Sequence, residues 1–303
     1  MNVMSEIEKL KEKRNAIVMA HNYQRPEIQD IADFIGDSLK LAQTAERTNA
    51  DVLVFCGVDF MAETAAIINP EKKVLVPDPE ASCPMANMLS VDDLLLAEKK
   101  FPDADIVLYI NTKADVKAEA DCVCTSANAT RIVDSMESDT ILFGPDKNLA
   151  YHVKIIGKSK KQIIQVPEHG LCPTHHQISG WDTVGAKRKH PDAKLVVHPE
   201  CIPEVQEMAD HIASTDGMID YCMQSPDKEF IIGTENGILH RMRKEMPDKR
   251  FYPASETSIC PNMKMHTLEK VRDVLENMNN EVTVPSKIAN RARGAIDRML
   301  ELS

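Results

Sequence analysis

The sequence lacks the segments that mark membrane, secreted and nucleic-acid-binding proteins. Its apolar runs, such as residues 52–56, are far too short to cross a bilayer. The amino-terminal stretch MNVMSEIEKLKEKRN is charged and has no apolar core, so we expect no signal peptide and a cytoplasmic protein. Acidic residues outnumber basic ones, 47 against 36, and the net charge is −11. We therefore expect neither a membrane nor a nucleic acid as a partner.

Closely spaced cysteine pairs of the kind found in metal hairpins are also missing. The eight cysteines show neither the Cys-x2-Cys spacing of zinc sites nor the tight runs of ferredoxins. In a reducing compartment, cysteines are metal ligands, catalytic groups or buried small residues before they are disulfides. Three of them, Cys83, Cys172 and Cys260, are each followed by proline. Cys56, Cys201 and Cys222 are expected to be buried core residues. The close pair Cys122-x-Cys124 is expected to be a pair of solvated or buried spectators, and the alternative is a redox-active pair near a site.

The chain contains a weak internal repeat with a period of 88–89 residues. The three Cys-Pro pairs are 89 and 88 residues apart. Three apolar runs, at 16–23, 105–112 and 193–200, keep the same period and are expected to be the first strand of each unit. Two further strands are expected in each unit, and the expected helix starts also keep the period: Ser38, Ser126 and Ser214–Thr215.

Short apolar strands that alternate with helical stretches predict parallel sheets covered by helices on both faces. We therefore expect an α/β fold of three αβα domains, each a βαβαβ unit, related by a pseudo-threefold axis around a shared central site. The predicted domains are residues 1–87, 88–178 and 179–263. The helical segment 264–303 is expected to pack back on the first domain.

Polar groups follow the first strand of each unit, where parallel sheets usually bind ligands. Glu200 is the one carboxylate among them, with Asn22 and Asn111 as its expected repeat equivalents. It is the candidate general acid or base, assisted by His198 and Tyr23. The matching triplets are His21-Asn22-Tyr23, Tyr109-Ile110-Asn111 and His198-Pro199-Glu200.

Hydroxyl groups at three expected helix starts form a second set of candidates. Ser38, Ser126 and Thr215 would combine a hydroxyl with exposed backbone N–H groups, which suits a carboxylate or phosphate. Simple helix capping would explain each of them without a ligand. Together they suit a substrate that carries two carboxylates and a phosphate.

The three Cys-Pro cysteines suit a [4Fe–4S] cluster in which one iron stays open to substrate. Equivalent loops of three domains can converge on one point, and an open iron is a Lewis acid that helps a hydroxyl group to leave. The alternative is that these cysteines are buried structural residues. His175 follows Cys172 by three residues and would lie near such a cluster, whereas His152 carries no comparable signal.

Long stretches of the chain resemble the quinolinate synthase A family, over about residues 5–300. The resemblance implies an enzyme that condenses iminosuccinate with dihydroxyacetone phosphate to give quinolinate, phosphate and water in de novo NAD biosynthesis. It also implies three αβα domains around a [4Fe–4S] cluster held by Cys83, Cys172 and Cys260. The stretches that carry it are IVMAHNYQRPEIQDIADFIGDSLKLAQ, DPEASCPMA, LYINTKADVKAEADCVCTSANA, VPEHGLCPTHH, VVHPEC and ETSICPNMK.

The resemblance extends to the site residues and to a partner, the aspartate-oxidising enzyme that supplies iminosuccinate. Some members of the family carry a cysteine-rich motif at the third ligand, but here the sequence is Cys260-Pro-Asn-Met263, so we expect no disulfide regulation there. The implied substrate-binding and active-site positions are His21, Tyr23, Ser38, Tyr109, Ile110, Asn111, Ser126, His175, His198, Pro199, Glu200 and Thr215.

Three other functions fit parts of the pattern. An aconitase-like hydratase would use the same open iron on one substrate, and it would release no phosphate from dihydroxyacetone phosphate. An iron–sulfur redox sensor would form no small-molecule product. A zinc structural protein would be distinguished by metal analysis.

Overall fold

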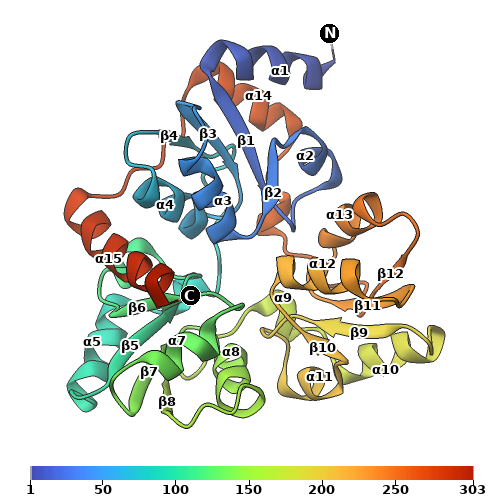
Figure 1. The fold of residues 1–303 in the computed structure, drawn as a ribbon. Coiled ribbons are helices and arrows are strands. Elements are labelled where there is room, and N and C mark those ends of the chain that lie inside the picture. Colours follow the sequence, from blue (N-terminus) through green and yellow to red (C-terminus); the bar gives the residue numbers. More distant parts are fainter. Residues whose placement is uncertain (1, 303) are drawn as a thin grey trace. The chain divides into compact units, whose positions relative to one another are not determined.

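The computed structural model describes residues 2–302, without the side chains of Ser38 and Ala42. Its strands form three four-stranded sheets, in which all the strand pairs are parallel. Each sheet has the same order, with the second strand at one edge, followed by the first, third and fourth (Figure 1). The predicted α/β fold with three helix-covered parallel sheets is confirmed.

The described chain divides into two compact units, which we describe separately. The first unit runs to Cys83 and includes Cys260–Ser286, and the second comprises Pro84–Ile259 and the residues from Lys287 onward. The first unit holds one sheet and the second holds two. The three domain boundaries expected from the repeat stay a prediction.

The first unit is built around the sheet of β1 to β4. Its strands are mostly buried, because β1 and β3 lie in the middle of the sheet and are covered on both faces. The strands are β1 (Ala16–His21), β2 (Phe34–Gly36), β3 (Val52–Cys56) and β4 (Lys73–Leu75). The helices are α1 (Val3–Arg14), α2 (Pro26–Ile31), α3 (Ser38–Glu46), α4 (Asp59–Ile68), the 3₁₀ turn η3 (Asn262–Lys264) and α14 (Leu268–Asn277).

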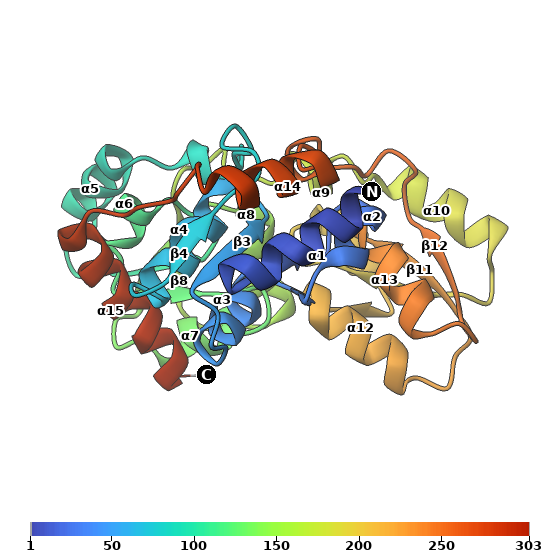
Figure 2. The ribbon, with the colours of Figure 1, turned by 90° about the horizontal axis from the view of Figure 1, so that it is seen from above.

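Helix α14 covers one face of this sheet together with α1. Its apolar residues Val271, Val274 and Leu275 join the core that contains Ile7 of α1. Arg14 at the end of α1 donates a hydrogen bond of 3.1 Å to the Leu275 carbonyl. Figure 2 shows the two helices side by side. The carboxy-terminal segment therefore packs on the first unit as far as α14.

The second unit contains the other two sheets. One is formed by β5 (Asp105–Tyr109), β6 (Cys122–Cys124), β7 (Thr140–Gly144) and β8 (Gln162–Gln165), and the other by β9 (Lys194–Val197), β10 (His211–Ile212), β11 (Glu229–Gly233) and β12 (Arg250–Pro253). The helical segments are η1 (Ala86–Met88), α5 (Val91–Lys100), α6 (Ala114–Lys117), α7 (Ala129–Ser135), α8 (Lys147–Tyr151), the π turn η2 (His152–Ile156), α9 (Pro173–His176), α10 (Gly180–Lys189), α11 (Pro203–Met208), α12 (Thr215–Gln224), α13 (Ile238–Glu245) and α15 (Ser286–Leu302).

Helix α15 departs from the expectation for residues 264–303. Apart from its first residue it belongs to the second unit, where Arg291 forms a two-pronged ion pair with Glu119, at 2.8 and 2.6 Å. The expectation that this whole segment packs on the first domain thus describes α14 and not α15.

The structure adds one short edge strand to each sheet beyond the three expected from the sequence. These strands, β2, β6 and β10, are two or three residues long and pair on one side only. Such runs are too short to show the alternation by which a strand is recognised. Cys122 and Cys124 lie in β6 and are fully buried, as expected for spectators.

An aspartate at the same place in each repeat ties the edge strand to the first strand. Asp33, Asp121 and Asp210 each precede the edge strand, and they are 88 and 89 residues apart. Their carboxylates accept the backbone N–H groups of Val18 (2.7 Å), Ile106 (2.8 Å) and Leu195 (2.8 Å), respectively. The backbone N–H of each aspartate also donates to the carbonyl of the same strand residue. This pair of bonds fixes where the edge strand begins and shows that the repeat extends to individual hydrogen bonds.

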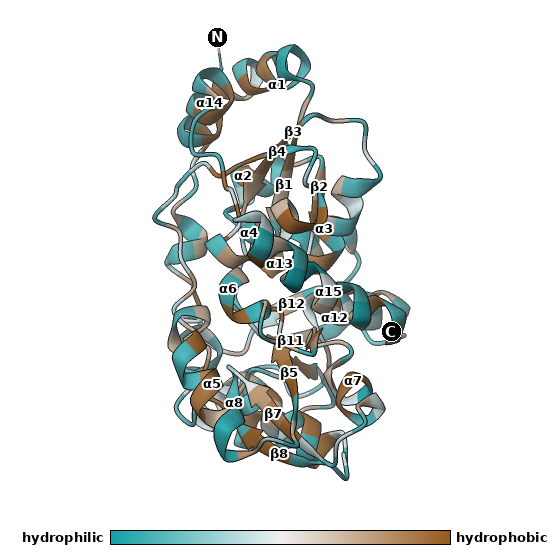
Figure 3. Ribbon diagram, turned by 90° about the vertical axis from the view of Figure 1, so that its left-hand side faces the viewer, coloured by the Kyte–Doolittle hydropathy of each residue, from teal (hydrophilic) through white to brown (hydrophobic). Residues whose placement is uncertain are grey.

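Apolar residues concentrate in the strands and on the inner faces of the helices. Figure 3 shows the brown, hydrophobic strands β5 and β7 against helices banded in both colours. Burial of this kind is the main favourable contribution to folding. None of the helices in residues 2–302 combines the length and the apolar character that a membrane span requires.

We expect the hydrogen bond that Asp210 shares with its equivalents in the other two repeats to make the stability of the protein depend on pH. Burial raises the pKa of Asp210, but the Leu195 N–H and the Lys187 ammonium outweigh it and hold the pKa below its ordinary value. The stabilisation is therefore present above pH about 4 and is lost as the pH falls through the lower, folded-state pKa. Asp210→Asn should lower the free energy of unfolding at neutral pH by about 1 kcal/mol.

The measurement is the midpoint of urea unfolding at neutral and acidic pH. Asp192→Asn is the matched control, because it removes the same charge from an exposed residue nearby. Equal effects of the two substitutions at neutral pH would contradict the assigned role of Asp210.

Candidate functional site

The site of the second unit lies where two of its parallel strands end. Strand β5 ends at Tyr109, and β9 ends one residue before His198. The short helix α9 begins at Pro173, directly after Cys172. Proline suits the first position of a helix and keeps the preceding residue extended, which is the conformation of Cys172. These three segments bring together a phenol, two imidazoles, a carboxylate and a thiol.

Glu200 is the centre of this group. Its side chain is 3% exposed. Its Oε1 accepts a hydrogen bond of 2.7 Å from the Tyr109 hydroxyl, and its Oε2 lies 2.8 Å from His175 Nδ1. Asn111 Nδ2 lies 3.5 Å from Oε1, at the limit of a hydrogen bond. The predicted residues Tyr109, Asn111, His175 and Glu200 therefore lie in contact.

The two histidines pack against each other beside this carboxylate. The rings of His175 and His198 are stacked, with centroids 4.7 Å apart. His198 Nδ1 accepts the Glu200 backbone N–H at 3.3 Å, so a neutral His198 carries its proton on Nε2. His198 thus holds the backbone of Glu200 by this hydrogen bond, and its ring also packs against His175, which contacts the Glu200 carboxylate.

Two buried carboxyl groups, those of Glu200 and Asp146, have pKa values that are shifted in opposite directions. Burial raises the pKa of Glu200, but the charges of His175 and His198 and the hydrogen bonds from His175 and Tyr109 outweigh it and hold the pKa well below its ordinary value. Burial, with the negative charge of Glu200, raises the pKa of Asp146 well above its ordinary value. Glu200 is therefore the ionised member of the pair.

Cys172 lies at one side of the same group. Its Sγ is 3.1 Å from His175 Nδ1, and its backbone N–H donates to Asp146 Oδ2 at 2.9 Å. One ligand atom each from Cys172, His175 and Glu200 lie within 4.8 Å of one another. A thiolate, an imidazole and a carboxylate at this spacing can hold a metal ion.

Several residues that support the group were not singled out in the sequence. Thr234 Oγ1 lies 2.7 Å from His175 Nε2, and Asn148 donates to the Glu200 carbonyl at 2.9 Å. The repeat carries a signal for these supporting residues. A glycine, one further residue and a carboxylate stand at the end of the third strand along the chain in each sheet, and the glycine is either the last strand residue or the next one. The three copies are Gly57-Val58-Asp59, Gly144-Pro145-Asp146 and Gly233-Thr234-Glu235.

The first unit carries the matching strand end with different side chains. His21 and Tyr23 are buried, with ring centroids 4.5 Å apart. The Tyr23 N–H donates to His21 Nδ1 at 3.2 Å, just as the Glu200 N–H donates to His198 Nδ1. The repeat equivalent of Glu200 in the first unit is therefore Tyr23. The expected equivalence with Asn22 is wrong by one residue, whereas the period of 88–89 residues still pairs Glu200 with Asn111.

Two Cys-Pro loops meet within the first unit. Asn262, two residues after Cys260, donates a hydrogen bond to the carbonyl of Ser82, the residue before Cys83. The Cys83 N–H donates to Asp59 Oδ1 at 3.2 Å, which repeats the bond between Cys172 and Asp146. The same arrangement thus holds the backbone of two Cys-Pro cysteines.

Burial separates the eight cysteines into two classes. Cys83, Cys172 and Cys260 are half-buried, and the other five are buried. Burial raises the pKa of the Cys122 thiol to about 11 and that of Cys222 to about 12, which disfavours the thiolate form that binds metals. Burial therefore disfavours the five other cysteines as metal ligands and does not disfavour the three Cys-Pro cysteines in the same way.

The expected helix-start residues differ in their placement. Thr215 begins α12 behind the cap Ser214, and it is buried. Helix α3 begins at Ser38, whose side chain lies outside the described part of the structure. Ser126 lies in a turn two residues before the cap Asn128 of α7, so the expectation of a helix start there is wrong. The physical reason is that Asn128 accepts the Thr125 N–H at 2.7 Å, which closes the turn and delays the helix.

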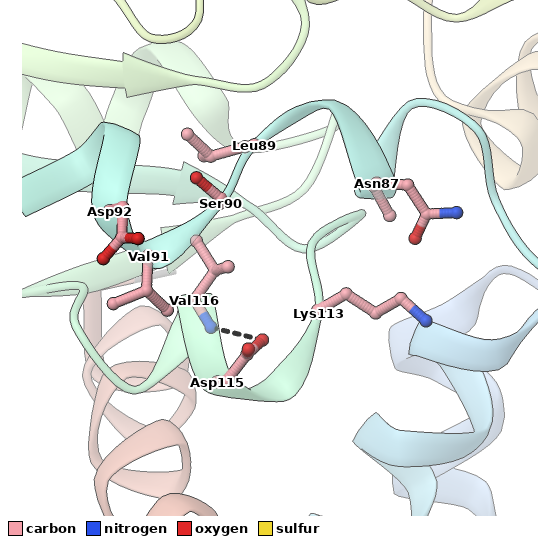
Figure 4. Close-up of a pocket in the computed structure, with 9 residues that line it drawn as sticks. Asn87, Leu89, Ser90, Val91, Asp92, Lys113, Asp115 and Val116 are labelled. Atoms are coloured by element: carbon pink, nitrogen blue, oxygen red, sulfur yellow. Dashed lines mark hydrogen bonds between the residues drawn. The ribbon is translucent and has the colours of Figure 1, made fainter.

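A separate hollow of about 320 Å³ lies on the second unit and contains none of the predicted site residues. In Figure 4, the side chains of Lys113 and Asn87 extend to the same side, and Asp115 accepts the Val116 N–H at 2.9 Å. Its remaining lining residues are Ala86, Leu89, Ser90, Val91 and Asp92.

The fold is that of an α/β protein with parallel, helix-covered sheets, and a cysteine, a histidine and a carboxylate near the strand ends of the second unit form a group that can hold a metal ion. The chain matches the family described as quinolinate synthetase A protein over residues 5–301, and it belongs to that family.

Relatives named quinolinate synthase align over nearly the whole chain. The one from Pyrococcus horikoshii is 54% identical over 304 residues, covering 100% of both chains. The one from Methanothermobacter thermautotrophicus is 54% identical and covers 98% of this chain and 97% of its own length. The one from Thermococcus onnurineus is 55% identical, with 99% and 98% covered.

The hydrogen bond between Thr234 and His175 is open to a direct test. Thr234→Val keeps the shape but leaves a ring nitrogen of the buried His175 without this partner, so the free energy of unfolding should fall by about 1–3 kcal/mol. Urea unfolding measures the change. Thr140→Val, the same substitution outside the site, serves as the control, and an equal effect of both would contradict the assigned role of Thr234.

Proposed function

We propose that this chain is a cytoplasmic quinolinate synthase that condenses iminosuccinate with dihydroxyacetone phosphate to give quinolinate, phosphate and water. Quinolinate formed in this way enters de novo NAD biosynthesis. The proposal includes an aspartate-oxidising enzyme as the partner that supplies iminosuccinate. Membership of the family and the shared name of its relatives, quinolinate synthase, support it.

The observation that carries the proposal is the buried group around Glu200. An ionised carboxylate lies 2.8 Å from His175, which in turn lies 3.1 Å from the Cys172 thiol. A reaction that removes water and moves protons needs such an acid–base group next to the site where the hydroxyl leaves.

Cys83, Cys172 and Cys260 are the proposed ligands of a [4Fe–4S] cluster. Three thiolates leave one iron with an open coordination position, and such an iron acts as a Lewis acid toward a hydroxyl group. The half-buried state of these three thiols, against the full burial of the other five, supports this choice of ligands.

The proposed substrate-binding residues lie at the strand ends, at the starts of α3 and α12, in the turn before α7 and, for His175, in α9. Burial of the site strengthens charge-assisted hydrogen bonds to carboxylates and phosphate, and holding two reactants in place can lower a barrier by roughly 7–11 kcal/mol. The proposed set is His21, Ser38, Tyr109, Ile110, Asn111, Ser126, His175, His198, Pro199, Glu200 and Thr215.

Glu200 is the proposed general acid or base. Its low pKa means that it begins in the form that accepts a proton. His175 and Tyr109, both hydrogen-bonded to its oxygens, compensate the charge before the proton arrives. His198 and Tyr23 are the proposed assistants in proton movement.

Removing a proposed ligand should remove the cluster. Protein purified without oxygen is expected to contain about four irons per chain, with broad visible absorbance. Alanine at Cys83, Cys172 or Cys260 should abolish the iron content and the absorbance, whereas Cys222→Ala should retain both. Iron and acid-labile sulfide analysis makes the measurement. A colourless, active protein that contains zinc would overturn the cluster.

Glu200→Gln should separate catalysis from assembly. Glutamine keeps the shape and accepts hydrogen bonds but cannot accept a proton, so turnover should fall by roughly 10²–10⁴-fold with iron content unchanged. The assay follows quinolinate formation and phosphate release from dihydroxyacetone phosphate. Near-normal turnover with weak substrate binding would move Glu200 from catalysis to recognition. Absence of phosphate release from the unchanged protein would contradict the proposed reaction.

A further inference from the structure

Each repeat has a buried side-chain donor on the short helix that follows its first strand. The residues are Gln29 on α2, Lys117 on α6 and Gln206 on α11, and they are 88 and 89 residues apart. Their exposed fractions are 2%, 0% and 2%. Around two of them the sequence itself repeats, as Pro-Glu-Ile-Gln at 26–29 and Pro-Glu-Val-Gln at 203–206.

In the first unit, Gln29 holds the backbone on both sides of Tyr23. Its Nε2 donates to the carbonyls of Asn22 (3.2 Å) and Gln24 (2.9 Å). A loop that leaves a sheet has no strand partners for these carbonyls, and buried carbonyls need donors. One amide group therefore fixes the chain before and after the aromatic side chain.

In the second unit, Gln206 does the same around Glu200. Its Nε2 donates to the carbonyls of Pro199 (2.8 Å) and Cys201 (2.7 Å). Lys117 makes the corresponding bond next to Asn111, from its Nζ to the Thr112 carbonyl at 2.7 Å. In all three repeats the donor thus binds the carbonyl that follows the equivalent of Glu200.

The loop at Glu200 is held most completely. Asn148 Nδ2 donates to the Glu200 carbonyl at 2.9 Å, so the carbonyls of three successive residues, 199, 200 and 201, are all bound by buried amides. Gln206 Nε2 also lies 3.1 Å from the Asn148 carbonyl, which links the two amides.

His152 sets the orientation of the Gln206 amide. Its Nδ1 lies 3.2 Å from Gln206 Oε1, and because that oxygen only accepts, the ring must donate its Nδ1–H. The Gln206 NH₂ group is then turned toward the loop. His152 begins the π turn η2, a helix irregularity of the kind often found near functional sites.

We propose that Gln29, Lys117 and Gln206 are positioning residues that hold Tyr23, Asn111 and Glu200 in their working places. For Gln206 the proposal rests on the catalytic role of Glu200 in the proposed function. The shared requirement is an N–H donor at this position, since an amide serves in two repeats and an ammonium in the third. Glu200 meets Tyr109 and His175 at 2.7 and 2.8 Å, so a small shift of its loop breaks both bonds.

Gln206→Leu tests the proposal by two independent readouts. Amide hydrogen exchange of the peptide that contains residues 198–201, measured without substrate, should become faster, because the loop loses its donor. Turnover should fall by about 10–100-fold with iron content retained, because Glu200 is misplaced. Met208→Ala, an exposed change on the same helix, should alter neither quantity.

The amide hydrogen exchange measurement does not depend on which reaction the protein catalyses. Faster exchange in Gln206→Leu supports the positioning role even if the unchanged protein forms no quinolinate, which would contradict only the proposed function. Unchanged exchange together with unchanged turnover would overturn the positioning role.

Lys117 supplies a second test that does not depend on Gln206→Leu being folded. Lys117→Gln introduces the donor found in the other two repeats and should keep turnover and the exchange of residues 109–112 close to those of the unchanged protein. Lys117→Met removes the donor at similar length, so it should speed exchange and lower turnover by about tenfold or more. Equal behaviour of the two variants would overturn the requirement for a donor.

Discussion

The site depends on one constraint, which is that a negative charge is kept almost completely away from water. A buried carboxylate is costly unless opposite charges and hydrogen bonds compensate it. Tyr109, His175 and His198 provide this compensation for Glu200, and they come from three separate segments of the second unit. The folding of the unit and the assembly of the site are therefore the same event, because the charge is tolerated only when all three segments are in place.

Much of this arrangement could be predicted from the sequence because the repeat orders the chain. Apolar runs ending in His21, Tyr109 and His198 placed these residues at equivalent strand ends, and the structure confirms the parallel sheets that this requires. The period also pointed to Cys172, and the spacing of three residues pointed to His175 as its neighbour. The structure brings both to Glu200.

The rest could not be predicted, for physical reasons that differ from case to case. The edge strand β10 is two residues long, so it shows no alternation. Ser126 was mistaken for a helix start because hydroxyl residues often cap helices. Here Asn128 occupies the position before α7, and its side chain accepts the Thr125 N–H of the preceding turn instead. His152 was set aside because its partner Gln206 is 54 residues away, and only the fold brings the two together. Such long-range polar contacts leave no pattern in a single sequence.

The division of the cysteines has a consequence for damage by oxygen. Oxidation to sulfenic and higher acids requires a reachable thiolate, so five of the eight thiols are protected by burial and by pKa values that favour the protonated form. Lesions should then collect at the half-buried Cys83, Cys172 and Cys260. The interior of each sheet would remain reduced, and early lesions such as mixed disulfides could be reversed by a thiol without unfolding the chain. The pattern of burial thus divides the cysteine thiols into five that are protected from oxidation and three that can be oxidised and reduced again.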